Sequence, residues 1–182
     1  MSPSFSHCGI LIRPITPADR LSLFAAVRES IDTLGRWMSW CHADYAISET
    51  DQWIALCQGQ WQSASDREFG IFDAASGEAL GGVGLNQINA ANHFANLGYW
   101  VRASRTGKGV ASIAATLAAR FGFGELRLAR LEIVACLDNV ASRRVAEKVG
   151  GQFEGIARSR LQLKGEARDA AVYSLLPGDL VG

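Results

Sequence analysis

The clearest chemical pattern is the glycine-containing segment Arg105-Thr106-Gly107-Lys108-Gly109-Val110-Ala111. It follows an apolar run ending at Val101 and precedes a stripe of apolar residues typical of a helix. The first N–H groups of a helix have no partner within it, and the helix dipole places partial positive charge there. Glycine lets the backbone approach a ligand and adopt positive φ. The segment therefore predicts a site for a phosphate or pyrophosphate, with an ordinary glycine turn as the alternative.

Two common nucleotide-binding motifs do not fit this segment. A Walker A loop would require glycine at Arg102 and serine or threonine at Gly109. A dinucleotide-binding fingerprint would require glycine or alanine at Ser112 and an acidic residue at the end of the next strand. Asp138 lies near that strand end, but about thirty residues beyond the loop, which is too far.

The elements that would position this segment follow from hydrophobic periodicity and helix-capping signals. Apolar residues with helical spacing follow the loop, at Val110, Ile113, Ala114, Leu117, Ala118 and Phe121. Thr16-Pro17-Ala18-Asp19 and Ser48-Glu49-Thr50-Asp51 predict the starts of helices that end near Glu29 and Gln62. Another helix is expected over about 140–149, ended by Gly150-Gly151. Strands are predicted over 9–13, 67–73, 79–88, 95–101, 131–136, 153–162 and 169–176.

The resulting order, β-α-α-β-β-β-α-β-α-β-β, predicts an α/β (α+β) fold with a mixed, mostly antiparallel central sheet. A chain of 182 residues fits one domain, over residues 1–182. The charges balance, with 18 acidic and 18 basic residues, so neither nucleic acid nor a membrane is an expected partner.

The cysteines and histidines are scattered, which predicts free thiols and no metal site. They are Cys8, Cys41, Cys57 and Cys136, and His7, His42 and His93. The stretch from Met1 to Arg13 lacks the basic start and apolar run of a signal peptide. We therefore expect a cytoplasmic location.

The stretch from Tyr99 to Phe121 resembles motif A of the GCN5-related N-acetyltransferase (GNAT) superfamily. In that family a Q/R-x-x-G-x-G/A loop binds the pyrophosphate of coenzyme A. Gly109 and Ala111 match the second half of this motif. Thr106 stands where glutamine or arginine is commonest, and Arg105 is one residue early.

The downstream sequence resembles the ribosomal-protein N-terminal (RimJ/RimL-like) acetyltransferase subgroup. Asn139-Val140-Ala141-Ser142 and the following Val145 to Gly151 are similar to its N-x-x-S…EK-x-GF signature. The opening Ile12-Arg13-Pro14 and the C-terminal stretch from Glu154 to Ser174 also fit, so the similarity covers nearly the whole chain.

The resemblance implies a GNAT fold with about four helices, strands that splay at the cofactor site, acetyl-CoA as co-substrate and no metal. The implied cofactor-binding residues are Tyr99, Trp100, Val101, Arg105, Thr106, Gly107, Lys108, Gly109, Val110, Ala111, Asn139 and Ser142. The main chain of the first three would pair with the pantetheine arm, and the Ser142 hydroxyl would protonate the coenzyme A thiolate. From residue types alone, Asn139 and Ser142 are equally explained as a helix N-cap pair, and the side chains of Tyr99 and Trp100 as sheet residues.

The general base and the acceptor site are less sharply defined. The subgroup carries a carboxylate on the strand after the last helix, where this chain has Leu161. Glu68 is our candidate catalytic carboxylate and Glu154 another, although both are typical of ordinary surface acids. Trp37 and Trp40 lie where the family builds its acceptor site, so we expect them to bind substrate. Aromatic core packing is the alternative.

The sequence thus predicts an acetyl-CoA-dependent N-acetyltransferase acting on a primary amine. An α-amine is favoured because its pKa, about 7.7–8.0, lies well below the lysine value of about 10.4. The same fold could instead acetylate a small amine, such as an amino-acid derivative, a polyamine or an aminoglycoside. A non-catalytic acyl-CoA sensor or a structural or interaction domain would also fit these patterns, and a homodimer is compatible with any of these functions.

Overall fold

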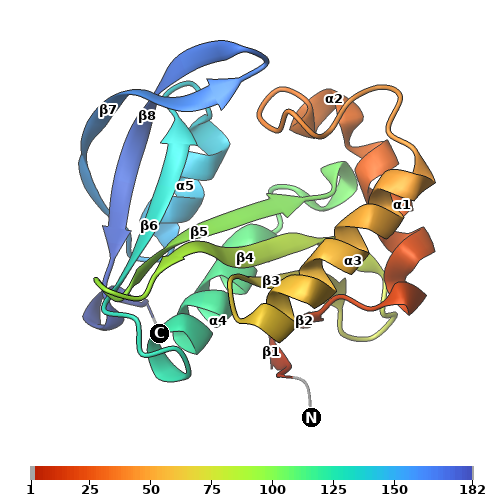
Figure 1. Ribbon diagram of the computed structural model, residues 1–182, viewed down its shortest axis with the longest axis horizontal. Coiled ribbons are helices and arrows are strands. Elements are labelled where there is room, and N and C mark those ends of the chain that lie inside the picture. Colours follow the sequence, from red (N-terminus) through yellow and green to blue (C-terminus); the bar gives the residue numbers. More distant parts are fainter. Residues whose placement is uncertain (1–2, 182) are drawn as a thin grey trace.

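One eight-stranded sheet, in the order β1-β2-β3-β4-β5-β6-β8-β7, organises the molecule in the computed structural model, which describes residues 3–181 (Figure 1). Neighbouring strands are antiparallel except for the parallel pair β5 and β6. The mixed, mostly antiparallel sheet is as predicted. The strands are β1 (Phe5–His7), β2 (Ile10–Pro14), β3 (Arg67–Asp73), β4 (Ala79–Asn89), β5 (Phe94–Val101), β6 (Arg130–Cys136), β7 (Gln152–Leu163) and β8 (Glu166–Leu175).

Helices cover both faces of this sheet (Figure 1). The apolar stripe of α4 packs against Phe69, Leu85 and Leu97 in the largest core cluster. Leu23 of α1 and Ile54 of α3 form a second cluster, which also contacts Trp100. The helices are α1 (Arg20–Glu29), α2 (Ile31–Leu34), α3 (Ile47–Ser63), α4 (Val110–Gly124) and α5 (Val140–Lys148), with 3-10 turns at Pro17–Asp19, Ala103–Arg105 and Pro177–Asp179.

Strand register decides which side chains face α1 and α3. Glu68 pairs with Gly84, which pairs with Gly98. Directly opposed residues of antiparallel strands lie on the same face of a sheet, and side chains two residues apart share that face. Gly82 and its partner Trp100 therefore lie on the Glu68 face. The intervening positions, such as Phe69, belong to the α4 core.

Strands β5 and β6 separate along most of their length. They pair only over Phe94–Asn96 and Arg130–Glu132, although β5 continues to Val101 and β6 to Cys136. The backbone beyond the paired residues is therefore free to bind a ligand between the strands. This is the splay that the resemblance implied.

The structure differs from the predicted elements mainly near the N-terminus. The short strand β1 and the single turn α2 were not predicted, because three or four residues give little periodicity. The helix expected to start at Ser48 begins at Ile47 with Ala46 as its N-cap. There Glu49 Oε1 accepts a hydrogen bond from the Ala46 N–H at 2.7 Å, so the acid rather than the serine decides where the helix starts.

Candidate active site

The first of two pockets lies where β5 and β6 separate, and its volume is about 580 Å³. We call it the glycine-loop pocket. Residues of β5 and β6 form its sides, and the start of α5 contributes Asn139 and Ser142. The loop and the start of α4 close one end, with Arg105, Thr106, Gly107, Gly109, Val110 and Ala111.

The conformation of the loop suits an anion. Gly107 and Gly109 have φ angles of +73° and +80°, a left-handed conformation that favours glycine. A Cβ atom on Gly107 would meet nothing within 4 Å, and one on Gly109 only Ile113 Cδ1 at 3.9 Å. Gly109 is the N-cap of α4, a helix of 15 residues, so the unpaired N–H groups of its first turn line an open space.

The polar side chains of the loop are largely occupied within the protein. Arg105 Nη2 donates to Glu78 Oε2 at 2.8 Å, and Thr106 Oγ1 donates to the Ala103 carbonyl at 2.9 Å. Backbone N–H groups are therefore the main donors that the loop offers. Among the described residues, Lys108 and Trp100 were expected at this pocket but do not line it.

At the start of α5, Asn139 and Ser142 form the predicted N-cap pair. The Ser142 N–H donates to Asn139 Oδ1 at 3.1 Å. The Tyr99 hydroxyl donates to the Ser142 carbonyl at 2.9 Å and lies 3.3 Å from Ser142 Oγ. Burial raises the pKa of Tyr99 to about 12. Two neutral hydroxyl groups thus lie side by side in the glycine-loop pocket.

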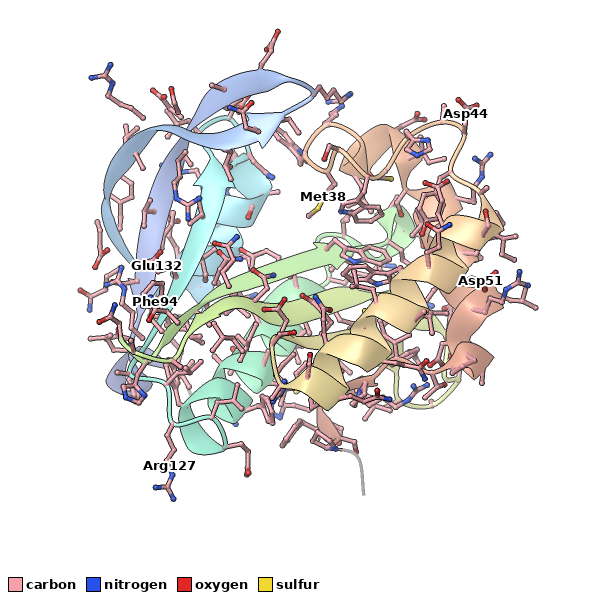
Figure 2. The ribbon with its side chains drawn as sticks, viewed as in Figure 1. Met38, Asp44, Asp51, Phe94, Arg127 and Glu132 are labelled. Carbon is pink, nitrogen blue, oxygen red and sulfur yellow. The ribbon has the colours of Figure 1, made fainter. Side chains whose placement is uncertain are left out.

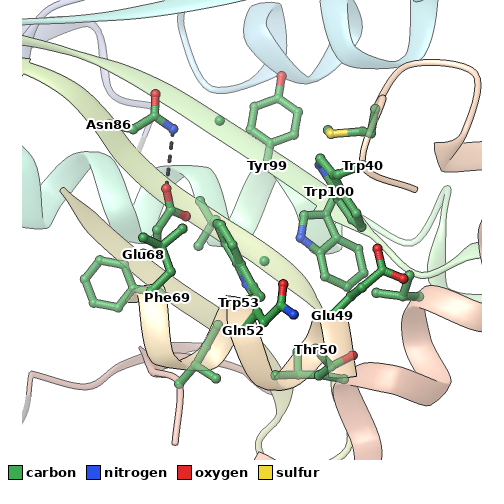
Figure 3. Close-up of a pocket in the computed structure, with 18 of the residues that line it drawn as sticks. Trp40, Glu49, Thr50, Gln52, Trp53, Glu68, Phe69, Asn86, Tyr99 and Trp100 are labelled. Atoms are coloured by element: carbon green, nitrogen blue, oxygen red, sulfur yellow. Dashed lines mark hydrogen bonds between the residues drawn. The ribbon is translucent and has the colours of Figure 1, made fainter. Parts of the chain in front are cut away.

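The second pocket, of about 420 Å³, lies against the Glu68 face of the sheet and between α1 and α3. We call it the aromatic pocket. Its lining includes Trp40, Tyr45, Trp53 and Trp100, and Figure 3 shows Trp53 and Trp100 converging on it from α3 and β5. Met38, Gly98 and Tyr99 line both pockets; Met38 is labelled in Figure 2. The two spaces therefore meet at the middle of β5.

Two glycines of β4 make room on the floor of the aromatic pocket. A Cβ atom on Gly84 would lie 2.0 Å from Glu68 Oε2, and one on Gly82 would lie 2.6 Å from Trp100 Nε1. The Glu68 carboxyl and the Trp100 indole therefore lie directly over the β4 backbone. No larger residue fits at Gly84 without moving the carboxyl group.

Glu68 is a carboxyl group of the aromatic pocket whose pKa is strongly raised. Burial raises its pKa from 4.5 to about 7, because a charged carboxylate loses hydration there. Asn86 Nδ2 donates to Glu68 Oε1 at 3.4 Å (Figure 3). Asn96 Nδ2 donates to Asn86 Oδ1 at 2.9 Å. Asn96 lines the glycine-loop pocket and Asn86 the aromatic pocket, so polar side chains connect the two.

The remaining predicted residues divide between the pockets or lie outside them. Trp40 lines the aromatic pocket, whereas Trp37 lines the glycine-loop pocket. Leu161 also lines the glycine-loop pocket and supplies no carboxylate. Glu154 pairs with Arg130 Nη2 at 2.5 Å, and this pairing lowers its pKa to about 2. A carboxyl group held in the ionised form by an arginine is a weak base, so Glu68 is the better candidate.

The roles of Asn86, Asn96 and Trp53, and of the Tyr99 side chain, were not predicted from the sequence. Each depends on a neighbour distant along the chain, such as Ser142 for Tyr99. One local signal was present. Gly82 and Gly84 alternate within the strand-like run Leu80 to Leu85, and glycine within a strand often marks a place where another group approaches closely.

Two kinds of feature are absent from residues 3–181. No group of three or more His, Cys, Asp or Glu side chains in this range is arranged to hold a metal ion. Within the same range, no helix combines the length and the apolar character needed to cross a bilayer.

Comparisons with known proteins agree with this geometry. Residues 10–152 match the family model described as "Acetyltransferase (GNAT) domain". The chain is 29% identical over 174 residues to "Putative ribosomal N-acetyltransferase YdaF" of Bacillus subtilis, covering 95% of this chain and 94% of the relative.

Solved structures are similar over nearly the full length. A structure titled "a putative ribosomal-protein-serine acetyltransferase" from Vibrio cholerae has a TM-score of 0.86 at 30% identity, covering 96% of this chain and 98% of that one. The ribosomal L7/L12 acetyltransferase RimL, solved with coenzyme A, has a TM-score of 0.87 at 21% identity, with 96% and 98% covered. At that identity the likeness shows the fold alone.

Proposed function

Because this chain belongs to the GNAT family of N-acetyltransferases, we propose that it moves an acetyl group from acetyl-CoA to a primary amine, foremost the α-amine of a peptide or protein. One observation carries the proposal. A carboxyl group with a pKa of about 7, Glu68, lies in a pocket that meets the glycine-loop pocket at Gly98 and Tyr99. An amine and a thioester can therefore approach each other from the two pockets.

The glycine-loop pocket has the features that a coenzyme A molecule requires. The backbone N–H groups of Gly107 to Ala111 would bind the pyrophosphate. The unpaired edge of β5, over Tyr99 to Val101, would hydrogen-bond the pantetheine arm as an added strand would. Asn139 lies at the same pocket. When bound, acetyl-CoA supplies an acetyl group activated as a thioester.

Glu68 and Ser142 would perform the two proton transfers. The amine nitrogen attacks the acetyl carbon, a C–N bond forms and the C–S bond breaks. Glu68 accepts the proton that the amine loses, for which a pKa near 7 is well suited at neutral pH. Ser142 Oγ, beside the Tyr99 hydroxyl, donates a proton to the departing thiolate and recovers one through Tyr99 or solvent. The products are an N-acetylated amine and free coenzyme A.

The preference for an α-amine follows from the proton balance. At neutral pH, deprotonating an α-amine costs about 3.5 kcal/mol less than deprotonating lysine, because the pKa values differ by roughly 2.5 units. A base with a pKa near 7 can neutralise an α-amine with little penalty. The names "Putative ribosomal N-acetyltransferase YdaF" and "a putative ribosomal-protein-serine acetyltransferase" are consistent with this substrate class.

Two assays test the proposal in sequence. Isothermal titration with acetyl-CoA should show binding, and absence of binding at millimolar ligand would refute both the enzyme and the acyl-CoA sensor. Release of free coenzyme A thiol should then be followed over a panel of peptides and small amines. Binding without thiol release from any member would leave only the sensor.

A further inference from the structure

The lining of the aromatic pocket indicates which kind of group the acceptor carries next to its amine. Three tryptophans and Tyr45 line it, together with aliphatic side chains such as Leu23 and Val27. Trp40 contacts Trp100 edge-to-face, with ring centroids 5.8 Å apart, and Tyr45 at 6.2 Å. Pockets of 300–1,000 Å³ with mainly apolar walls and few polar groups are typical of small-molecule sites. At about 420 Å³, this pocket lies within that range.

The charges of the lining restrict what the pocket accepts. Among the described residues that line it there is no lysine, arginine or histidine, and its two carboxyl groups are those of Glu49 and Glu68. Glu49 is already occupied, because it accepts from the Ala46 N–H at 2.7 Å and pairs with His42 at 3.0 Å. Nothing in the lining would neutralise a carboxylate or phosphate, so an anionic substituent is excluded on grounds of desolvation.

The size of the pocket argues against a small substituent. A methyl or hydroxymethyl group next to the amine would leave most of a 420 Å³ space in contact with water. Each apolar group that displaces this water strengthens binding, and aromatic rings add edge-to-face contacts with the indoles. The walls therefore favour a bulky apolar group over a small one.

We propose that the preferred acceptor is an amine that carries a bulky, uncharged aromatic group, bound against Trp53 and Trp100 with its nitrogen directed to Glu68. This rests on the proposed function and names the substrate class of the same site. Two sources share that chemistry: a free arylalkylamine, and a peptide whose first residue is aromatic. Trp40, which is 39% exposed at the pocket, is then a specificity residue.

The test is a thiol-release assay with purified full-length protein and acetyl-CoA. Ethylamine is compared with 2-phenylethylamine, and tripeptides starting with Ala, Phe or Asp but otherwise identical are compared with one another. We expect kcat/KM at least ten times higher for 2-phenylethylamine than for ethylamine, or for the Phe peptide than for the Ala peptide, and the lowest value for the Asp peptide. Whichever of 2-phenylethylamine and the Phe peptide has the higher kcat/KM shows whether the acceptor is a free arylalkylamine or a peptide.

Failure of the acceptor inference and failure of the proposed function would give different results. Equal or faster acetylation of the Ala peptide and of ethylamine would overturn the inference while supporting the proposed function. No thiol release from any acceptor would instead refute the proposed function. A high rate with the Asp peptide would contradict the argument from charge.

A variant pair links the preference to the pocket. Trp40→Ala should lower kcat/KM about five-fold more for the better aromatic acceptor than for its small partner, which narrows the ratio between the two kcat/KM values. Phe153→Ala is the matched control, because Phe153 is a 53% exposed aromatic residue on β7 that lines neither pocket. An unchanged ratio in Trp40→Ala, or the same change in both variants, would overturn the assignment of Trp40.

Discussion

At the scale of single residues, the mechanism we propose gives Glu68 and Ser142 opposite proton transfers on opposite sides of β5. Glu68 lies on the face covered by α3, and Ser142 contacts the hydroxyl of Tyr99 from the start of α5. Gly98, which is in register with Gly84 and Glu68, and the next residue Tyr99 face opposite sides of the sheet, since neighbouring residues of a strand point to opposite faces. A substitution of Glu68 should therefore leave the glycine-loop pocket unchanged, and a substitution of Ser142 should leave the aromatic pocket unchanged.

Ser142→Ala should lower kcat about 10- to 100-fold, at the lower end of general acid catalysis, because a thiolate is a good leaving group. The affinity for coenzyme A should stay within about three-fold, since the Asn139 cap uses the Ser142 backbone N–H, which alanine keeps. Stopped-flow turnover and isothermal titration measure the two quantities. Unchanged kcat would remove Ser142 from the mechanism.

The buried carboxyl group also predicts a pH-dependent cost in stability. Because the pKa of Glu68 is raised in the folded protein, the unfolded chain loses this proton first as pH rises from about 4.5 through about 7. Folding stability contributed by the neutral form is therefore present at low pH and lost above about pH 7. Glu68→Gln, which stays neutral, should be more stable than the natural protein at pH 8 by up to about 3 kcal/mol.

Urea unfolding at pH 4.5 and pH 8 measures this difference. The free energies of unfolding of the two proteins should be nearly equal at the lower pH, where Glu68 is largely protonated in the folded state. If the difference in free energy of unfolding between Glu68→Gln and the natural protein were the same at pH 8 as at pH 4.5, the Glu68 carboxyl group would be well hydrated in the folded protein.

At the scale of elements, we propose that the left-handed glycine loop and the first turn of α4 form one anion site. Gly109→Ala should weaken acetyl-CoA binding at least ten-fold, because the left-handed conformation is unfavourable for alanine and its methyl group enters the pocket. Gly77→Ala is the matched control. Gly77 has a φ of +74°, no atom lies within 4 Å of the place where its Cβ would be, and it lies outside both pockets.

Both variants should lose about 1–2 kcal/mol of stability from backbone strain. Titration calorimetry then separates the two effects, because only Gly109→Ala should lose affinity. Equal affinities would mean that the loop does not contact the cofactor.

The same elements explain what the sequence could predict. The glycine loop, the α4 stripe and the Asn139 cap are local patterns, and each was found from spacing alone. The environment of Glu68 is not local. It depends on Gly84, across the β3–β4 pair, and on the packing of α3 over that face. The sequence alone does not show that an acidic residue on a strand is buried, because its burial depends on the neighbouring strand and the covering helix.

At the scale of the whole molecule, a network of charges joins three distant parts of the chain next to the glycine loop. Arg102, which is 9% exposed, pairs with Glu29 at the end of α1 and with Glu78 before β4. Glu29 Oε1 also accepts from the Ser104 N–H at 2.8 Å, and its pKa falls to about 2 because of Arg102. The network therefore holds α1 against the start of the glycine loop.

Glu29→Gln should lower the free energy of unfolding at pH 7 by about 1–3 kcal/mol, because it leaves part of the Arg102 charge unpaired. Asp51→Asn is the control, since the Arg20–Asp51 pair is exposed and ion pairs screened by water contribute little to stability. Urea unfolding compares the two. Equal losses of the free energy of unfolding in the two variants would show that the Arg102 network stabilises the fold no more than an exposed ion pair does.

In the mechanism we propose, Glu68 accepts the proton of the amine at the junction of the two pockets. The most direct test is the pH dependence of kcat/KM for thiol release, in the natural protein and in Glu68→Gln. If Glu68 is the base, kcat/KM of the natural protein should rise with pH with a midpoint near 7, because the pKa of Glu68 is about 7. The variant should lose this rise and about 100-fold of the rate. A variant that retains the rate and the same rise near pH 7 would show that Glu68 is not the base.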